Sequence, residues 1–139
     1  MDFTEGIILD IRNNGGGYFN YMYNTASLFY AGEKTLLYTS YKNGKGHGDF
    51  SEPKSYEQKG KAFIANTVPV VILTGRYTYS AANLFAFVMN DLPNSVLIGE
   101  RTGGGGGPIT CVTLPNGWIL QYPFEKTYST TRHKHGIWH

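Results

Sequence analysis

Short apolar runs and amphipathic stretches alternate along this chain. Continuous apolar runs rich in β-branched residues predict buried strands at 6–12, 69–74 and 95–100. Other stretches have apolar residues at three- and four-residue spacing, which predicts helices over 18–30 and 80–92. The repeated order of strand, helix and strand predicts an α/β fold with a mainly parallel sheet covered by helices.

Alternation of apolar and polar residues predicts three more strands, over 34–41, 109–114 and 118–122. The last two are separated by a Pro-Asn-Gly turn, so we expect a β-hairpin added at one edge of the sheet. The polar segment 43–53 predicts a surface loop. The segment 56–65 is interpreted as a short helix or a loop.

Composition and charge exclude several classes of protein. The chain has 139 residues, which predicts one domain, and no apolar run approaches the ~20 residues that a membrane span requires. A net charge of +2 with scattered basic residues is not typical of a nucleic-acid-binding surface. The acidic start of the chain has no features of a secretory signal. The single cysteine, Cys111, cannot form an internal disulfide and is predicted to lie in the core.

Ser80 lies between the apolar strand 69–74 and the helix 80–92. At a helix N-terminus its hydroxyl would be exposed at a sharp bend. The neighbouring backbone N–H groups and the positive end of the helix dipole could then face a developing oxyanion. An ordinary helix-capping serine is the alternative interpretation.

Two glycine clusters follow predicted strands. Gly15–Gly17 separates a strand from a helix, so its N–H groups could approach a bound group closely, although a simple tight turn would also explain it. Gly103–Gly107 is followed by Pro108 and a strand instead of Lys-Ser/Thr and a helix, which argues against a nucleotide-binding loop. We therefore expect no nucleotide cofactor.

Three histidines lie close to the C-terminus, at His133, His135 and His139. Two of them at i, i+2 would share one face of a strand, but no cysteine or paired carboxylate joins them as a metal ligand. A solvated tail is the favoured interpretation, and we expect no metal site.

Three motifs resemble the C-terminal-processing (tail-specific) serine peptidases and their tricorn-core relatives. They are GIILDIRNNGGG at 6–17, VPVVILTGRYTYSAANLFA at 68–86 and VLIGERTGGG at 96–105. The motifs stand in the order of that family and at about its spacing, and together they extend over most of the chain. The resemblance implies a crotonase-like core of repeated strand–helix units, so 1–139 is predicted to be a single catalytic-core domain.

The same resemblance implies the roles of individual residues. Ser80 corresponds to the nucleophile, and the oxyanion hole would be formed by the amide of Ala81 and that of Gly16 or Gly17. The implied substrate is a polypeptide cut near its C-terminus, and the implied location is extracytoplasmic or periplasmic. The resemblance leaves the oligomeric state open.

The chain departs from the family pattern at the general base. The processing-peptidase branch has a lysine where this chain has Gly105, and a glutamate where it has Asn83. The tricorn-like branch uses a histidine upstream of the first motif and a more C-terminal glutamate. The family signature that begins at Gly136 breaks off at His139. We therefore expect a fragment of a longer protein whose base comes from outside this chain.

Three alternatives to that expectation remain. The in-chain histidines, including His47, lie outside the motifs, and His135 is the first of them to consider as a base. A chain without a base also resembles the retinoid-binding modules of the interphotoreceptor type. These modules share the core and carry apolar ligands, so a non-catalytic binding module is the main alternative function. An unrelated crotonase-type acyl-transfer activity is a further one.

Overall fold

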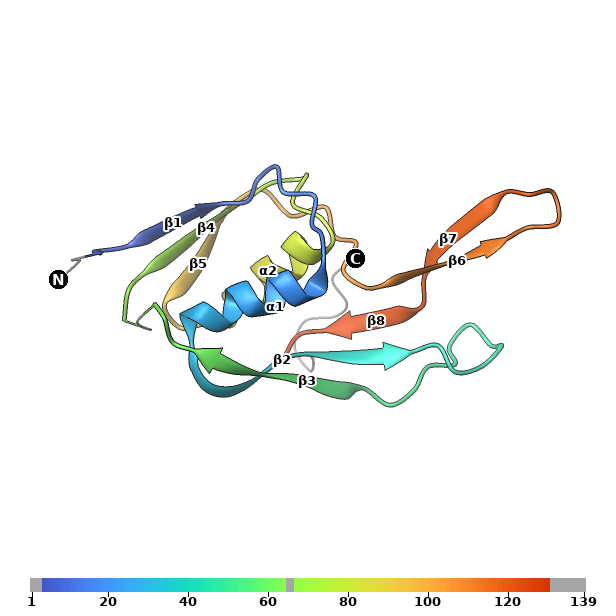
Figure 1. Ribbon diagram of the computed structural model, residues 1–139, viewed down its shortest axis with the longest axis horizontal. Helices are drawn as coiled ribbons and strands as arrows, with labels where there is room; N and C mark the ends of the chain where they lie inside the picture. Colours follow the sequence, from blue (N-terminus) through green and yellow to red (C-terminus); the bar gives the residue numbers. More distant parts are fainter. Residues whose placement is uncertain (1–3, 65–66, 131–139) are drawn as a thin grey trace.

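The computed structural model describes residues 4–64 and 67–130 (Figure 1). Three strands form a parallel sheet in the order β1-β4-β5, namely β1 (Ile7–Asp10), β4 (Val70–Thr74) and β5 (Ser95–Gly99). These strands are the apolar runs of the sequence, so this part of the prediction is confirmed.

Two helices pack against one face of the parallel sheet (Figure 1). They are α1 (Phe19–Ala26), which continues into a 3₁₀ turn at Ser27–Phe29, and α2 (Ala81–Asn90). Their apolar sides meet the inward residues of β4, and Ile72 is fully buried there. The predicted helices over 18–30 and 80–92 are therefore present.

The other face of the parallel sheet is not covered by the described residues. Ile8, Val96 and Ile98 are 70%, 50% and 52% exposed, whereas their strands were predicted to be buried. The prediction is wrong for the outer face because both helices lie on the same side of the sheet (Figure 1).

The remaining strands pair antiparallel, so the expected mainly parallel sheet is limited to three strands. A second sheet has the order β3-β2-β8, formed by β2 (Ala31–Tyr41), β3 (Lys54–Lys61) and β8 (Glu125–Tyr128). Helix α1 lies between the two sheets (Figure 1). Leu36 and Leu37 of β2 belong to the common core.

Strand β3 corrects the interpretation of 56–65 as a short helix or loop. Its sequence is polar, and its side chains alternate between exposed and half-buried. Pairing with β2 along eight residue pairs supplies the backbone hydrogen bonds that hold it extended. This pairing overrides the weak strand propensity of the segment.

The predicted hairpin is confirmed as β6 (Ile109–Thr113) and β7 (Ile119–Pro123). It projects from the body of the molecule and pairs with no other described strand, so it is not an edge of the parallel sheet (Figure 1). Cys111 is exposed on this hairpin, and the prediction of a core cysteine is wrong. The apolar neighbours that suggested burial are exposed as well.

No helix in the described part of the chain is long and apolar enough to cross a membrane.

Candidate active site

Ser80 stands at the junction of β4 and α2, immediately before the first residue of the helix. Its backbone has φ 54° and ψ −125°, a conformation that costs an L-residue about 1–3 kcal/mol and persists only when its surroundings enforce it. Its hydroxyl does not cap the helix and makes no other hydrogen bond within residues 4–64 and 67–130. The ordinary capping interpretation is therefore wrong.

Thr78 fixes the turn that carries Ser80. It is fully buried, and its hydroxyl donates to the carbonyl oxygen of Ile11 at 2.7 Å while accepting the N–H of Gly75 at 3.1 Å. The turn after β4 is thus tied to the end of β1. This long-range hydrogen bond brings the serine turn beside the first glycine cluster.

Gly16 packs directly against the peptide that joins Ser80 to Ala81. A methyl group at Gly16 would place its carbon 2.7 Å from the carbonyl oxygen of Tyr79 and 2.8 Å from the nitrogen of Ala81. Only a residue without a side chain can approach the serine turn this closely. The two segments that the sequence motifs separate by more than 60 residues therefore meet at Ser80.

Two backbone N–H groups beside Ser80 have no acceptor within the described residues, those of Gly17 and Ala81. The N–H of Gly16, in contrast, donates to Asn14 Oδ1 at 2.9 Å. Helix α2 begins at Ala81 and helix α1 begins two residues after Gly17, so the positive ends of two helix dipoles lie near this place. The arrangement can stabilise a negatively charged oxygen next to the serine.

The second glycine cluster borders the serine turn on another side. The carbonyl oxygen of Gly104 accepts the Ser80 N–H at 2.8 Å, and the carbonyl oxygen of Thr78 accepts the Gly103 N–H at 2.9 Å. A side chain at Gly105 would overlap the ring of Tyr79, and its φ of +70° also favours glycine. The position expected for a lysine base is thus filled by an aromatic ring.

Asn83 occupies the position at which a glutamate was noted in the sequence pattern. It is buried on α2, and its Oδ1 accepts the hydroxyl of Thr102 at 2.6 Å. This hydrogen bond satisfies the amide oxygen of Asn83 and connects α2 to the start of the glycine-rich loop. Asn83 therefore has a structural partner of its own in the described structure.

A cavity of about 300 Å³ opens beside the two unpaired amides. Its walls come from the end of β1, the first glycine cluster, α1 and the start of α2. The lining is mostly apolar, and the residues that border it include Gly16, Gly17, Tyr21, Met22, Ala81 and Phe85. A volume of this size lies at the lower end of small-ligand sites and can hold one large side chain.

An ion pair forms at the end of β1, where Asp10 borders this cavity. Arg12 Nη2 donates to Asp10 Oδ2 at 2.6 Å, and both side chains are exposed. The hydrogen bonds from Arg12 lower the pKa of the Asp10 carboxyl to about 2. Asp10 is therefore an anion at neutral pH and is unsuitable as a general base.

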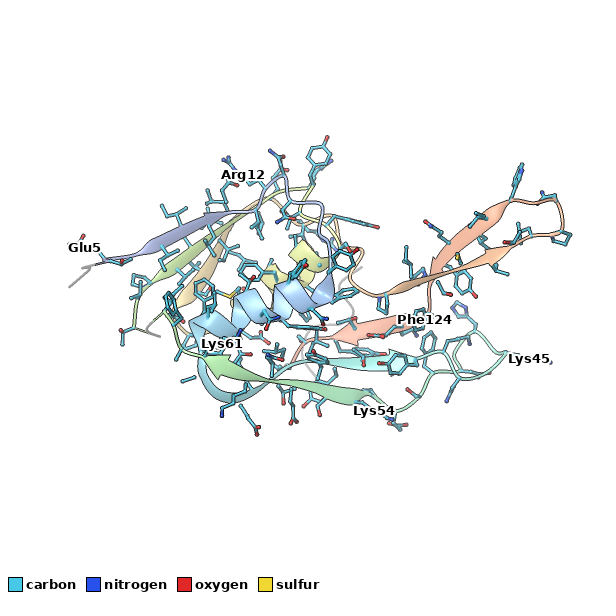
Figure 2. The ribbon with its side chains drawn as sticks, viewed as in Figure 1. Glu5, Arg12, Lys45, Lys54, Lys61 and Phe124 are labelled. Atoms are coloured by element: carbon cyan, nitrogen blue, oxygen red, sulfur yellow. The ribbon has the colours of Figure 1, made fainter. Side chains whose placement is uncertain are left out.

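No basic side chain contacts the Ser80 hydroxyl through a hydrogen bond in the described part of the chain. His47 lies in the loop between β2 and β3, close to Lys45, and Figure 2 shows this loop far from Arg12 at the end of β1. The other candidate bases, His133, His135 and His139, lie outside the described residues. No metal-binding group of His, Cys, Asp or Glu occurs among the residues that were described.

A strained serine before a helix, next to unpaired amides, is typical of serine hydrolases. Residues 2–137 match peptidase family S41, and the chain belongs to this family. It is 31% identical over 137 residues to the carboxy-terminal processing protease CtpA of Bacillus subtilis, covering 96% of this chain and 28% of that protein. It is 35% identical to the chloroplastic C-terminal processing peptidase of Tetradesmus obliquus, covering 82% of this chain and 23% of that protein.

Solved structures of peptidases are also similar to this chain. A structure from Parabacteroides merdae has a TM-score of 0.86 and 38% identity, with 91% of this chain and 40% of that chain covered. The photosystem II D1 C-terminal processing protease has a TM-score of 0.68 and 28% identity, with 90% of this chain and 30% of that chain covered. This chain therefore spans less than half the length of the proteins it resembles.

The structure brings the segment of Ser80 and Ala81 together with that of Gly16 and Gly17. Sequence reasoning did not find Asn14 and Thr78, whose side chains hold these segments in place. The only available signal for Asn14 was its position two residues before Gly16, where an asparagine commonly accepts a backbone N–H. No local signal marked Thr78, because its partner Ile11 lies 67 residues away.

Proposed function

We propose that this chain carries the nucleophile and the oxyanion hole of a serine peptidase that cleaves polypeptides near their C-termini. Ser80 attacks the scissile carbonyl carbon, and the resulting oxyanion accepts hydrogen bonds from Ala81 and from Gly16 or Gly17. The observation that supports the proposal is the close contact of Gly16 with the Ser80–Ala81 peptide, because the two segments that would donate to the oxyanion meet there.

Substrate binding follows from the cavity beside these amides. An apolar side chain next to the scissile bond would enter it, since most of its lining is apolar. The general base would be supplied from outside this chain, as the ring of Tyr79 fills the lysine position at Gly105. The names of the processing-protease relatives support a C-terminal cleavage site. An extracytoplasmic or periplasmic location rests on the family resemblance alone.

The proposal is tested by labelling the chain with a fluorophosphonate probe at pH 9, where hydroxide replaces the base. We expect slow labelling that disappears in Ser80→Ala, with thermal unfolding unchanged. Ser55→Ala, which alters an exposed serine on β3, serves as the matched control and should label like the unaltered chain. Absence of any Ser80-dependent labelling would instead favour the binding module for apolar ligands.

A further inference from the structure

We infer that Gly17, and not Gly16, supplies the second oxyanion N–H, and that Asn14 is the positioning residue that determines this choice. The inference rests on the proposed function. It concerns a residue that makes no hydrogen bond to the Ser80 hydroxyl in the described structure. Asn14 acts through the loop that it holds.

Asn14 connects the two halves of the site by two hydrogen bonds. Its side-chain Oδ1 accepts the N–H of Gly16 at 2.9 Å, which forms a tight turn within the glycine cluster. Its backbone carbonyl oxygen accepts the N–H of Tyr79 at 3.1 Å, one residue before the serine. Its own N–H donates to Ile11 at 3.1 Å, so the residue is anchored to the end of β1.

These bonds divide the glycine amides into one that is occupied and one that is available. The Gly16 N–H already has an amide oxygen as its acceptor, and an oxyanion would have to displace that oxygen. The Gly17 N–H has no acceptor in the described structure. Gly17 comes directly after Gly16, the residue that contacts Ala81. An available, prearranged donor stabilises a developing charge better than one that must first break a bond.

Loss of the Asn14 oxygen would release this arrangement. Gly16 has φ +100° and Gly17 has φ +154°, and glycine peptides of this kind rotate easily when no side chain restrains them. The Gly16 N–H would then lose its acceptor, and the orientation of the Gly17 N–H would no longer be fixed. The expected effect is a slower reaction of Ser80 in a protein that stays folded.

The experiment compares Asn14→Ala with Asn14→Ser, which differ by one hydroxyl oxygen, in the full chain. A serine oxygen can accept an N–H two residues later, although more weakly than asparagine. Asn116→Ala is the matched control, since Asn116 Oδ1 accepts the Trp118 N–H at 3.1 Å in the same kind of turn on the distant hairpin. The variants are labelled with ¹⁵N-glycine and ¹⁵N-alanine and studied by hydrogen exchange and NMR.

In the unmodified chain we expect the Gly16 amide to be protected from exchange and the Gly17 and Ala81 amides to be unprotected. Asn14→Ala should remove the protection of Gly16, and Asn14→Ser should restore part of it. After reaction of Ser80 with a fluorophosphonate at pH 9, the amide protons of Gly17 and Ala81 should move downfield while that of Gly16 does not.

The rate constant for this reaction should fall about tenfold in Asn14→Ala, less than the 10²–10³-fold loss of a whole donor, and recover in part in Asn14→Ser. Asn116→Ala should react like the unaltered chain. A downfield shift of the Gly16 amide, or an unchanged rate in Asn14→Ala, overturns the inference and leaves the proposed function standing. Absence of any Ser80 adduct overturns the proposed function and with it the role of Asn14.

Discussion

Two independent features of residue 16 require glycine. One is its positive φ, and the other is its close contact with the serine turn. We predict that Gly16→Ala slows fluorophosphonate labelling of Ser80 by 100-fold or more, on the order of the loss of an oxyanion donor. The added methyl group would displace the Ser80–Ala81 peptide, which must move because the clash is with backbone atoms. Labelling rate constants at pH 9, together with thermal unfolding curves, provide the measurement.

Gly15→Ala is the matched control for this prediction. A methyl group at Gly15 would meet no atom within 4 Å, and the change should leave labelling unaltered. Equal rates for the two variants would show that the close approach of Gly16 is irrelevant to the site.

The ring of Tyr79 leads to a prediction about Gly105. Gly105→Lys would introduce the side chain that the processing-peptidase pattern has at this position, but it would overlap the ring and adopt an unfavourable φ. We predict that this variant is less stable and labels no faster at pH 7 than the unaltered chain. The measurements are the unfolding midpoint and the labelling rate constant.

A double variant sharpens this test. Combining Gly105→Lys with Tyr79→Ala removes the ring, and it should recover stability relative to Gly105→Lys alone. Faster labelling by the single variant at pH 7 would show instead that the ring moves aside and that the lysine reaches Ser80.

The sequence predicts the place of some residues in the candidate site but not the roles of others. The positions of Ser80 and Gly16 follow from glycines and a serine placed at the ends of strands, which is a local pattern. The roles of Asn14 and Thr78 depend on partners that only the folded chain brings close. The overlap of Tyr79 with Gly105 is equally invisible in the sequence, because it depends on the direction of a ring.

Among the elements, those with a strong apolar period were predicted and those defined by pairing were not. Strands β1, β4 and β5 and both helices carry the apolar residues of the core. Strands β3 and β8 are polar, and each is extended because β2 provides backbone partners for it. The sequence also could not show that β2 leaves the parallel sheet, since strand pairing is a long-range property.

Strand β8 carries Glu125, and burial raises the pKa of this carboxyl although a hydrogen bond from Tyr41 partly offsets the rise. A raised folded-state pKa means that the stabilising contribution of the neutral form is present below the unfolded pKa and is lost as the pH rises through the folded pKa. We predict that Glu125→Gln raises the unfolding midpoint at pH 7 and changes it little below pH 4.

Thermal unfolding between pH 3 and pH 8 checks this prediction. Glu33→Gln, at an exposed position near the start of β2, serves as the control and should give the same midpoint as the unaltered chain at both ends of the range. A lower midpoint for Glu125→Gln at pH 7 would mean that the charged carboxylate has a favourable partner that outweighs its desolvation.

At the scale of the whole molecule, the groups that the proposed reaction requires are unevenly distributed. The Ser80 turn, the unpaired amides and the cavity are all formed by described residues at one end of the parallel sheet. Within residues 4–64 and 67–130, no basic side chain is hydrogen-bonded to the Ser80 hydroxyl. The chain also spans 28% of its Bacillus subtilis relative and 40% of the structure from Parabacteroides merdae.

The last prediction follows from this distribution. A serine hydroxyl without a base reacts through the small fraction that hydroxide deprotonates. We predict little or no peptidase activity for this chain at pH 7, and a labelling rate constant that rises about tenfold per pH unit from pH 7 to pH 10. Added imidazole should accelerate labelling of the unaltered chain but not of Ser80→Ala, because a free imidazole can act as the missing base.

A histidine of this chain acting as the base would produce a different profile. The rate constant would level off above about pH 6.5, the usual pKa of histidine, and imidazole would add little. Replacing His135 by glutamine would then abolish the plateau if His135 is the base. His47→Gln, in the distant loop, is the control. A plateau that survives both changes would contradict an external base as well as a base at either histidine.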